Sequence, residues 1–207
     1  KYCFQSQRPH YQRQHIDLDK LSSLLHEACD IGIFDINVCG GEPFMHPRIF
    51  HIIGNIVELG FCISLNTNAC LIDEGTAEKL AHMDVIKGIQ VSIDSHIKQV
   101  HNATRGSFDE TLAGLRCLCK YQDMTGATPT IGIVVNKHNY ATLIDTISYF
   151  ERYTNRFHLM NVMSNPGLSL SPDQQLDYAE RIIPGLREVA DSEDLFISSV
   201  TRGEYGS

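Results

Sequence analysis

The sequence predicts an α/β fold, a partial (β/α)6 TIM-like barrel with parallel strands, and three observations carry that prediction. Short runs of β-branched and aromatic residues alternate with amphipathic stretches of helical period, an order typical of a parallel sheet with right-handed crossovers. The chain has no G-x-G-x-x-G fingerprint, which argues against an open dinucleotide-binding sheet. Its 207 residues also fall short of the roughly 250 residues of a complete eight-stranded barrel.

The first half of the chain is expected to begin with a helix near residues 19–31, where leucines share one face. A buried strand over residues 34–38 follows it. Pro47 opens the next helix at its first turn, and Gly60 ends that helix. The remaining elements of this half are a strand, a helix and a strand over residues 61–65, 73–82 and 89–93.

The second half continues the same alternation. Asn139 is expected to cap a helix, and a capping box with proline at the first helical position starts another at Ser171. The other elements are a helix over residues 108–119 and strands over residues 130–135, 157–162 and 195–199. No linker, low-complexity tract or block of charge divides the chain, so residues 1–207 are expected to form one domain.

Composition excludes several classes of protein. An apolar content of 43% is enough to offset the entropy of ordering, which argues against disorder, and a net charge of -8 argues against a general nucleic-acid binder. No apolar run reaches the roughly 20 residues that span a bilayer, so no membrane association is expected. The seven cysteines are odd in number and scattered among apolar segments, which favours a reducing, cytoplasmic location.

Polar residues follow the expected strands at their carboxyl ends, where chemistry sits in parallel α/β folds. They suggest a rim that binds a polar ligand, although loops are often polar for no such reason. The segment from Cys39 to Pro43 is more specific, because paired glycines allow a ligand to approach the backbone and Glu42 follows at once. The strand-end polar residues elsewhere are Asn66, Asn68, Ser92, Asp94, Asn136 and Asn161.

Five segments, in order, resemble the radical S-adenosylmethionine (SAM) superfamily. Residues 37–43 are similar to its GGEP motif, and residues 1–4 to the end of its CxxxCxxC cluster loop. The three other matching segments are residues 64–68, 91–94 and 101–115. The resemblance implies a radical SAM core over residues 1–207, and with it a partial barrel.

The resemblance implies that Cys3 is the third thiolate ligand of a [4Fe–4S] cluster with one open iron. The first two cysteines of the motif would lie upstream of Lys1, and the chain has no C-x3-C-x2-C of its own. The first strand of the barrel and any C-terminal cysteine-rich auxiliary domain are likewise expected to be missing. The 207 residues alone are therefore expected to be inactive, whereas the full-length form is expected to be an enzyme.

The same resemblance assigns roles in SAM binding. Gly40, Gly41 and Glu42 are expected to bind the ammonium group of SAM, and Ser92 and Arg105 its carboxylate. The candidates for the ribose, the substrate or the adenine ring are Asn66, Asn68, Asp94, Val134, Val135 and Met160. A loop cap, a surface arginine or a core residue is the structural alternative for these positions.

The resemblance implies reductive cleavage of SAM at the cluster to a 5′-deoxyadenosyl radical, which abstracts hydrogen from a substrate. It is closest to the SPASM-type branch that modifies ribosomal peptides or proteins. The expected partners are therefore a peptide or small-molecule substrate and a reductant such as flavodoxin or ferredoxin. Two alternatives stay open: a molybdenum-cofactor-type radical cyclase acting on a nucleotide, and a non-catalytic degenerate barrel that serves as a binding module.

Overall fold

The computed structural model describes residues 15–83, 86–121, 128–162, 165–190 and 195–198. Its six strands are ordered β1-β2-β3-β4-β5-β6 in one sheet, as in the chain. Within the described residues every strand pair with an assigned register is parallel. The predicted class, α/β with six parallel strands in a partial barrel, is thereby confirmed. The chain divides into two compact units, one with residues 3–92 and 109–129, the other with residues 93–108 and 130–207.

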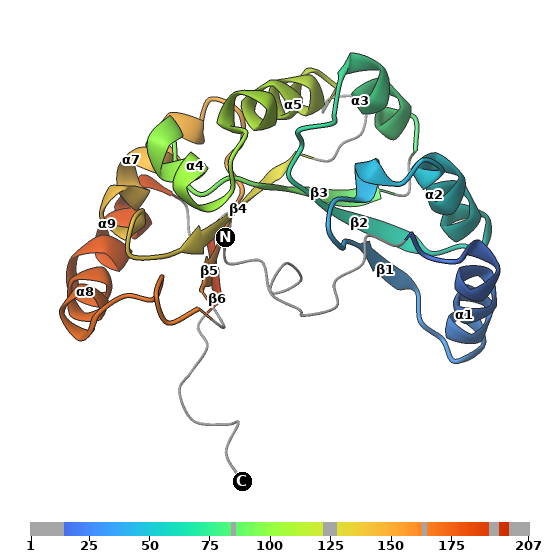
Figure 1. The fold of residues 1–207 in the computed structure, drawn as a ribbon, viewed down its shortest axis with the longest axis horizontal. Coiled ribbons are helices and arrows are strands. Elements are labelled where there is room, and N and C mark those ends of the chain that lie inside the picture. The colour runs from blue at the N-terminus through green and yellow to red at the C-terminus, as the bar shows by residue number, and fades with distance from the viewer. Residues whose placement is uncertain (1–14, 84–85, 122–127, 163–164, 191–194, 199–207) are drawn as a thin grey trace, which may run out of the picture. The chain divides into compact units, whose positions relative to one another are not determined.

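The first unit carries three strands and the helices that lie along one side of them (Figure 1). Its strands are β1 (Asp35–Val38), β2 (Cys62–Thr67) and β3 (Ile86–Ser92). Its helices are α1 (Leu18–Asp30), the short 3-10 helix η2 (Pro43–Met45), α2 (Ile49–Glu58), α3 (Glu74–Ala81) and α5 (Phe108–Lys120).

The two faces of this sheet differ in chemistry. Every second residue of β2, including Ile63 and Leu65, is buried, and so is Ile53 of α2. The alternate positions are polar and partly accessible: Asn37 pairs in register with Ser64, and Asn66 with Gln90. Strand periodicity therefore places an apolar core on the helix side and a polar surface on the other.

The second unit repeats this arrangement with strands β4 (Thr130–Val135), β5 (Phe157–Asn161) and β6 (Leu195–Ser198). Its helices are α4 (Lys98–Thr104), α7 (Leu143–Phe150), α8 (Pro172–Asp177) and α9 (Ile183–Val189), with a 3-10 turn η3 (Tyr140–Thr142) and a π-helical turn η4 (Tyr178–Ile182). Its core includes Ile131 and Ile133 of β4, Phe157 of β5 and Phe150 of α7, each no more than 1% exposed.

Several local predictions are confirmed. Gly60 follows α2 with a φ of +84°, the left-handed conformation that commonly ends a helix. Ser171 and Gln174 form the predicted reciprocal capping box, and Pro172 occupies the first turn of α8. Each predicted strand is present, with ends that differ by a few residues, as in β3, which starts at Ile86.

Two predictions need correction, and one helix was not predicted. Asn139 holds the N-cap position of η3, which runs directly into α7, but its side chain makes no cap bond. The N-cap of α7 itself is Thr142, and the Asn139 side-chain amide bonds other segments. The helix expected after Ser171 is interrupted by η4. Helix α4 was not predicted, because Lys98–Thr104 is short and mostly polar.

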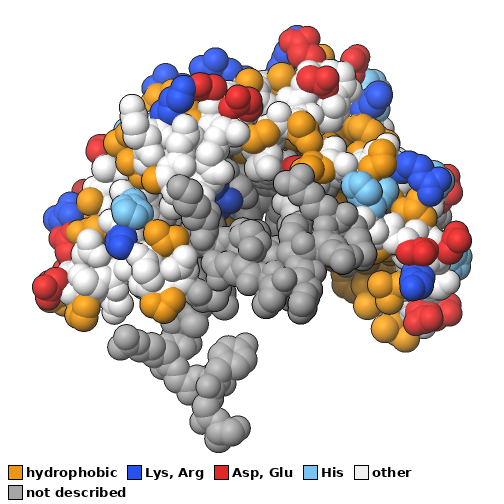
Figure 2. Space-filling model, in the orientation of Figure 1, with side chains coloured by type: hydrophobic (Ala, Val, Ile, Leu, Met, Phe, Trp, Pro, Cys, Tyr) orange, Lys and Arg blue, Asp and Glu red, His pale blue; other side chains and the backbone are white. Residues whose placement is uncertain are grey.

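The outward surface is mixed in charge. On the face shown in Figure 2, Lys and Arg side chains are interspersed with Asp and Glu over the helices. This mixing agrees with the net charge of -8 and gives no basic stripe on that face. None of the helices in the described ranges has the length and hydropathy of a membrane span.

Candidate functional site

The glycine pair lies in an exposed turn between β1 and η2. Gly40 has a φ of +146°, a conformation that side-chain-bearing residues rarely adopt. A Cβ atom at Gly40 would meet nothing within 4 Å, so the backbone angle and not crowding requires glycine there. The exposed turn leaves backbone groups of Gly40 and Gly41 at the surface, where a ligand can reach them.

Glu42 ties this turn to the loop that follows β2. Its Oε1 accepts a hydrogen bond of 2.7 Å from Thr67 Oγ1 and one of 3.3 Å from the Phe44 amide, and its Oε2 accepts one of 2.7 Å from the Asn68 amide. An ionised carboxylate offers about four lone-pair sites, so these three bonds leave room for one more donor. Glu42 can therefore brace two loops and still accept an ammonium group.

The loop after β2 is held in place by its own side chains. Thr67 Oγ1 accepts from the Ala69 amide at 2.9 Å, and Asn68 Oδ1 accepts from the Cys70 amide at 2.9 Å. Ala69 has a φ of +59° and is fully buried. A Cβ atom at Gly114 of α5 would overlap the Ala69 carbonyl, so the helix packs directly on this loop.

A cavity of about 550 Å³ lies in the same unit, between α1, α2, β1 and the glycine turn. Its walls are mostly apolar, with polar groups from Asn37, Glu42, His15 and His46. The two imidazole rings meet edge to face with centroids 4.7 Å apart. Burial and then the neighbouring His15 lower the pKa of His46, which favours its neutral form. The volume is within the usual range for small-molecule sites.

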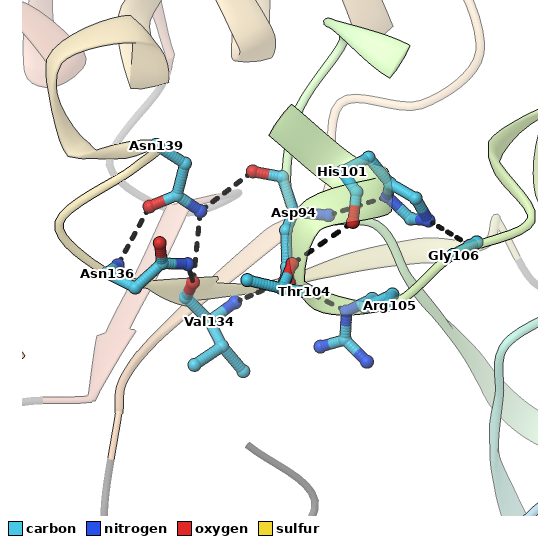
Figure 3. Close-up of polar contacts among 8 residues, drawn as sticks. All are labelled: Asp94, His101, Thr104, Arg105, Gly106, Val134, Asn136 and Asn139. Atoms are coloured by element: carbon cyan, nitrogen blue, oxygen red, sulfur yellow. Dashed lines mark hydrogen bonds and ion pairs between the residues drawn. The ribbon is translucent and has the colours of Figure 1, made fainter. Parts of the chain in front are cut away.

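The second unit contains a buried polar cluster centred on Asp94, which lies two residues after the end of β3 at Ser92 (Figure 3). The Asp94 side chain is 0% exposed. Its Oδ1 accepts from the Val134 amide at 3.0 Å and lies 2.9 Å from Arg105 Nε in an ion pair. Its Oδ2 accepts from Thr104 Oγ1 at 2.9 Å. A buried carboxylate needs such partners, because an unpaired buried charge is strongly disfavoured.

His101 holds the other side of the cluster (Figure 3). Its Nδ1 accepts from the Asp94 amide at 3.3 Å, and its Nε2 lies 3.0 Å from the Gly106 carbonyl oxygen. These partners assign the neutral tautomer with the proton on Nε2. The ring is fully buried, and burial lowers the pKa of His101. His101 therefore fixes the turn that carries Arg105.

Two asparagines complete the cluster. Asn139 Nδ2 donates to the carbonyl oxygens of Asp94 and Val134, and its Oδ1 accepts from the Asn136 amide. Asn136 Nδ2 also donates to Val134, at 2.9 Å. Both asparagines are fully buried and satisfy the backbone of this turn, so Asn136 is not part of an accessible rim.

The expected site residues differ in their partners and in their exposure. Glu42 and Asn68 are joined directly, and Asp94 is joined to Arg105, whose side chain is 21% exposed. Ser92 and Asn66 are partly accessible at the carboxyl ends of their strands. Val135 is 2% exposed and belongs to the core, while Val134 on the opposite face is partly accessible. Cys3 lies outside the described residues.

Four residues that hydrogen-bond to Glu42 or Asp94 were not among the sequence-based site candidates: Thr67, His101, Thr104 and Asn139. Thr67 could have been found from its place between two candidate asparagines. Asn139 could not, because it lies 45 residues from Asp94 in the chain.

Each unit by itself carries a group with the chemistry to bind one charged end of SAM. In the unit with β1 to β3 this group is the Glu42 carboxylate, which has an acceptor site to spare beside an exposed glycine turn, and in the unit with β4 to β6 it is the Arg105 guanidinium. Among the described residues no three His, Cys, Asp or Glu side chains converge as a metal site. The cluster ligand implied by the sequence, Cys3, is not among them.

Comparisons with known proteins give one consistent result. The family model of the Radical SAM superfamily matches residues 1–150. Mycofactocin maturase MftC of Mycobacterium ulcerans is 28% identical over 63% of this chain and 35% of its own length. The AdoMet-dependent heme synthase of Methanosarcina barkeri is 32% identical over 49% of this chain and 30% of its own length.

Solved structures agree on the fold. SuiB of Streptococcus suis bound to the precursor peptide SuiA superposes with a TM-score of 0.75 and 19% identity, over 96% of this chain and 45% of SuiB. SuiB bound to S-adenosylmethionine gives a TM-score of 0.71, also at 19% identity, over 95% of this chain and 46% of SuiB. The chain spans about a third of the length of the two curated relatives and under half of SuiB.

Proposed function

Because the chain belongs to the radical SAM superfamily, we propose that this protein binds SAM and a [4Fe–4S] cluster and acts as a radical enzyme on a peptide. The match of the family model over residues 1–150 carries this proposal. When bound, the cluster and SAM would supply a 5′-deoxyadenosyl radical that removes a hydrogen atom from the substrate.

The chain's own residues would bind and orient SAM. Glu42 and the Gly41 backbone face the ammonium group, since Glu42 has an acceptor site beyond its three hydrogen bonds. Ser92 and Arg105 hold the carboxylate. Asn66 and Asn68 serve the ribose or the substrate; Val134, the accessible neighbour of the buried Val135, contacts the adenine ring. Cys3 is the thiolate that this sequence contributes to the cluster.

The activity is tested with the full-length protein, reconstituted anaerobically, together with SAM and a low-potential reductant. Release of 5′-deoxyadenosine is expected, together with its loss in Cys3→Ala. A preparation that holds the cluster but releases no 5′-deoxyadenosine would overturn the proposal and favour a binding module.

A peptide substrate is supported by the relatives, since MftC is a maturase and SuiB is solved with its precursor peptide. The match to a heme synthase supports a small-molecule substrate as the second candidate. A fully deuterated cell extract, separated into peptide, nucleotide and tetrapyrrole fractions, distinguishes them. Deuterium in 5′-deoxyadenosine is expected with the peptide fraction; with the nucleotide fraction alone it would point to a nucleotide cyclase. A reductant such as flavodoxin or ferredoxin is proposed as the electron donor.

A further inference from the structure

Asp94 and Arg105 form an ion pair through one edge of the Arg105 guanidinium, the edge that carries Nε. The Nε atom of Arg105 lies 2.9 Å from Asp94 Oδ1, and Figure 3 shows the two terminal nitrogens of Arg105 pointing away from Asp94. The guanidinium has five donors in a planar fork, so one edge can hold a buried carboxylate while the other meets a ligand. The Arg105 side chain keeps 21% exposure, whereas that of Asp94 has none.

Asp94 is in turn fixed by elements on every side. The Val134 amide of β4 and the Thr104 hydroxyl of α4 donate to its carboxylate, and the Asn139 amide donates to its backbone carbonyl. His101 accepts from the Asp94 amide. A carboxylate held by this many partners has little freedom to move toward a ligand. It is well suited to hold another side chain still.

We propose that Asp94 is a positioning residue that fixes Arg105 for the carboxylate of SAM and does not itself contact SAM. This inference rests on the proposed function, and it replaces direct ribose or substrate binding as the role of Asp94. A long arginine side chain loses substantial rotamer freedom when it binds a ligand, and Asp94 has already removed part of that freedom. The negative charge of Asp94 is distributed over three donors, namely Thr104, Val134 and Arg105. We therefore expect that Asp94 strengthens SAM binding by orienting Arg105 more than it weakens binding by repelling the SAM carboxylate.

A double-mutant cycle on the reconstituted full-length protein tests the proposal by isothermal titration with SAM. Arg105→Ala is expected to weaken SAM binding by roughly ten- to a hundredfold, the range of a lost charge-assisted hydrogen bond. Asp94→Asn is expected to weaken it about fivefold, but less than about twofold when Arg105→Ala is already present. Independent, multiplying effects would overturn the proposal and return Asp94 to direct contact with the ligand.

A control and a second variant guard against trivial results. Asp177 and Arg181 form a matched but exposed Asp–Arg pair in α8 and η4, so Asp177→Asn should leave SAM affinity unchanged. Arg105→Lys keeps the charge and does not disturb Asp94. It should bind SAM nearly as weakly as Arg105→Ala, because a single ammonium held by Asp94 cannot also reach the ligand. Wild-type affinity in Arg105→Lys would contradict the proposal even if Asp94→Asn fails to fold.

A measurement without SAM separates this inference from the proposed function. The Nε–H signal of Arg105 in a nitrogen–proton NMR spectrum should exchange slowly with solvent in the wild type and quickly in Asp94→Asn. Equal exchange in both would overturn the positioning role. Wild-type protein that shows no SAM binding would overturn the proposed function, and with it the ligand assigned to Arg105.

Discussion

Glu42 shows how one side chain can serve both structure and ligand binding. Its carboxylate accepts the Thr67 hydroxyl proton through Oε1 and the Asn68 amide proton through Oε2. The glycine turn and the loop after β2 therefore depend on the same two oxygens. A substitution at this residue removes an acceptor from both segments at once.

Glu42→Ala should lower the free energy of unfolding by about 1–3 kcal/mol, because partly buried donors lose their acceptor. Chemical denaturation of the protein before cluster reconstitution measures this change. Glu58→Ala, an exposed residue at the end of α2, is the control and should change stability little. A Glu42→Ala variant as stable as the control would show that the loops do not depend on this carboxylate.

His101 makes stability depend on pH. Burial holds the pKa of His101 below 6.5 in the folded protein, so the unfolded chain binds more protons just below that pH. The free energy of unfolding should therefore fall as pH drops below about 6.5 and level off below the folded-state pKa. Nearby Asp94 opposes this shift and nearby Arg105 adds to it.

The contribution of His101 is isolated by comparing denaturation of the wild type with His101→Gln across this range. The pKa values of His46, His96 and His158 are also lowered by burial, and these residues keep their effect in both proteins. The stability difference should shrink as pH falls. A difference that stays constant would assign the pH dependence to the other histidines.

At the scale of elements, two helical glycines allow a matched comparison. Gly114 in α5 has no room for a Cβ atom against Ala69, whereas Gly54 in α2 has nothing within 4 Å of that position. Gly114→Ala should destabilise by about 1–3 kcal/mol through overpacking. Gly54→Ala should stabilise by up to about 1 kcal/mol through helix propensity. Thermal unfolding of both variants checks the opposite signs; the same sign in both would contradict this account of the packing.

The sequence predicts elements well where periodicity is strong. All six strands and the capping box of α8 follow from apolar runs and local cap residues, which depend on neighbours in the chain. Helix α4 was missed because seven mostly polar residues carry no apolar stripe. Asn139 was misassigned because its side chain bonds Asp94, 45 residues away, and a tertiary contact of that kind leaves no local signal.

For the candidate site, the sequence predicted which residues take part but not the roles that depend on tertiary contacts. Glu42, Arg105 and Asp94 could be selected from motifs and from strand ends. The role of Asp94 could not, because it depends on the Val134 amide of another strand. Val134 and Val135 were both candidates for the adenine ring, and the alternation along β4 puts Val134, and not Val135, on the accessible face.

At the scale of the whole chain, the net charge of -8 at neutral pH and the isoelectric point near 5.6 set its colloidal behaviour. Solubility should be lowest near pH 5.6, where repulsion between molecules is weakest. Precipitation by polyethylene glycol at constant salt, between about pH 5 and pH 8, measures this. A minimum well above pH 7 would require a surface charge distribution unlike the mixed one described for the helices.

The direct packing of Gly114 on Ala69 also bears on how this protein can be redesigned. Loops at the ends of parallel strands are attractive targets for libraries, since they are usually varied without touching the scaffold. Here the Ala69 carbonyl of the loop after β2 packs against Gly114 of α5, more than forty residues further along the chain. A library that diversifies this loop should therefore keep Gly114 and leave the Ala69 backbone in place, because any side chain at position 114 would overlap the Ala69 carbonyl.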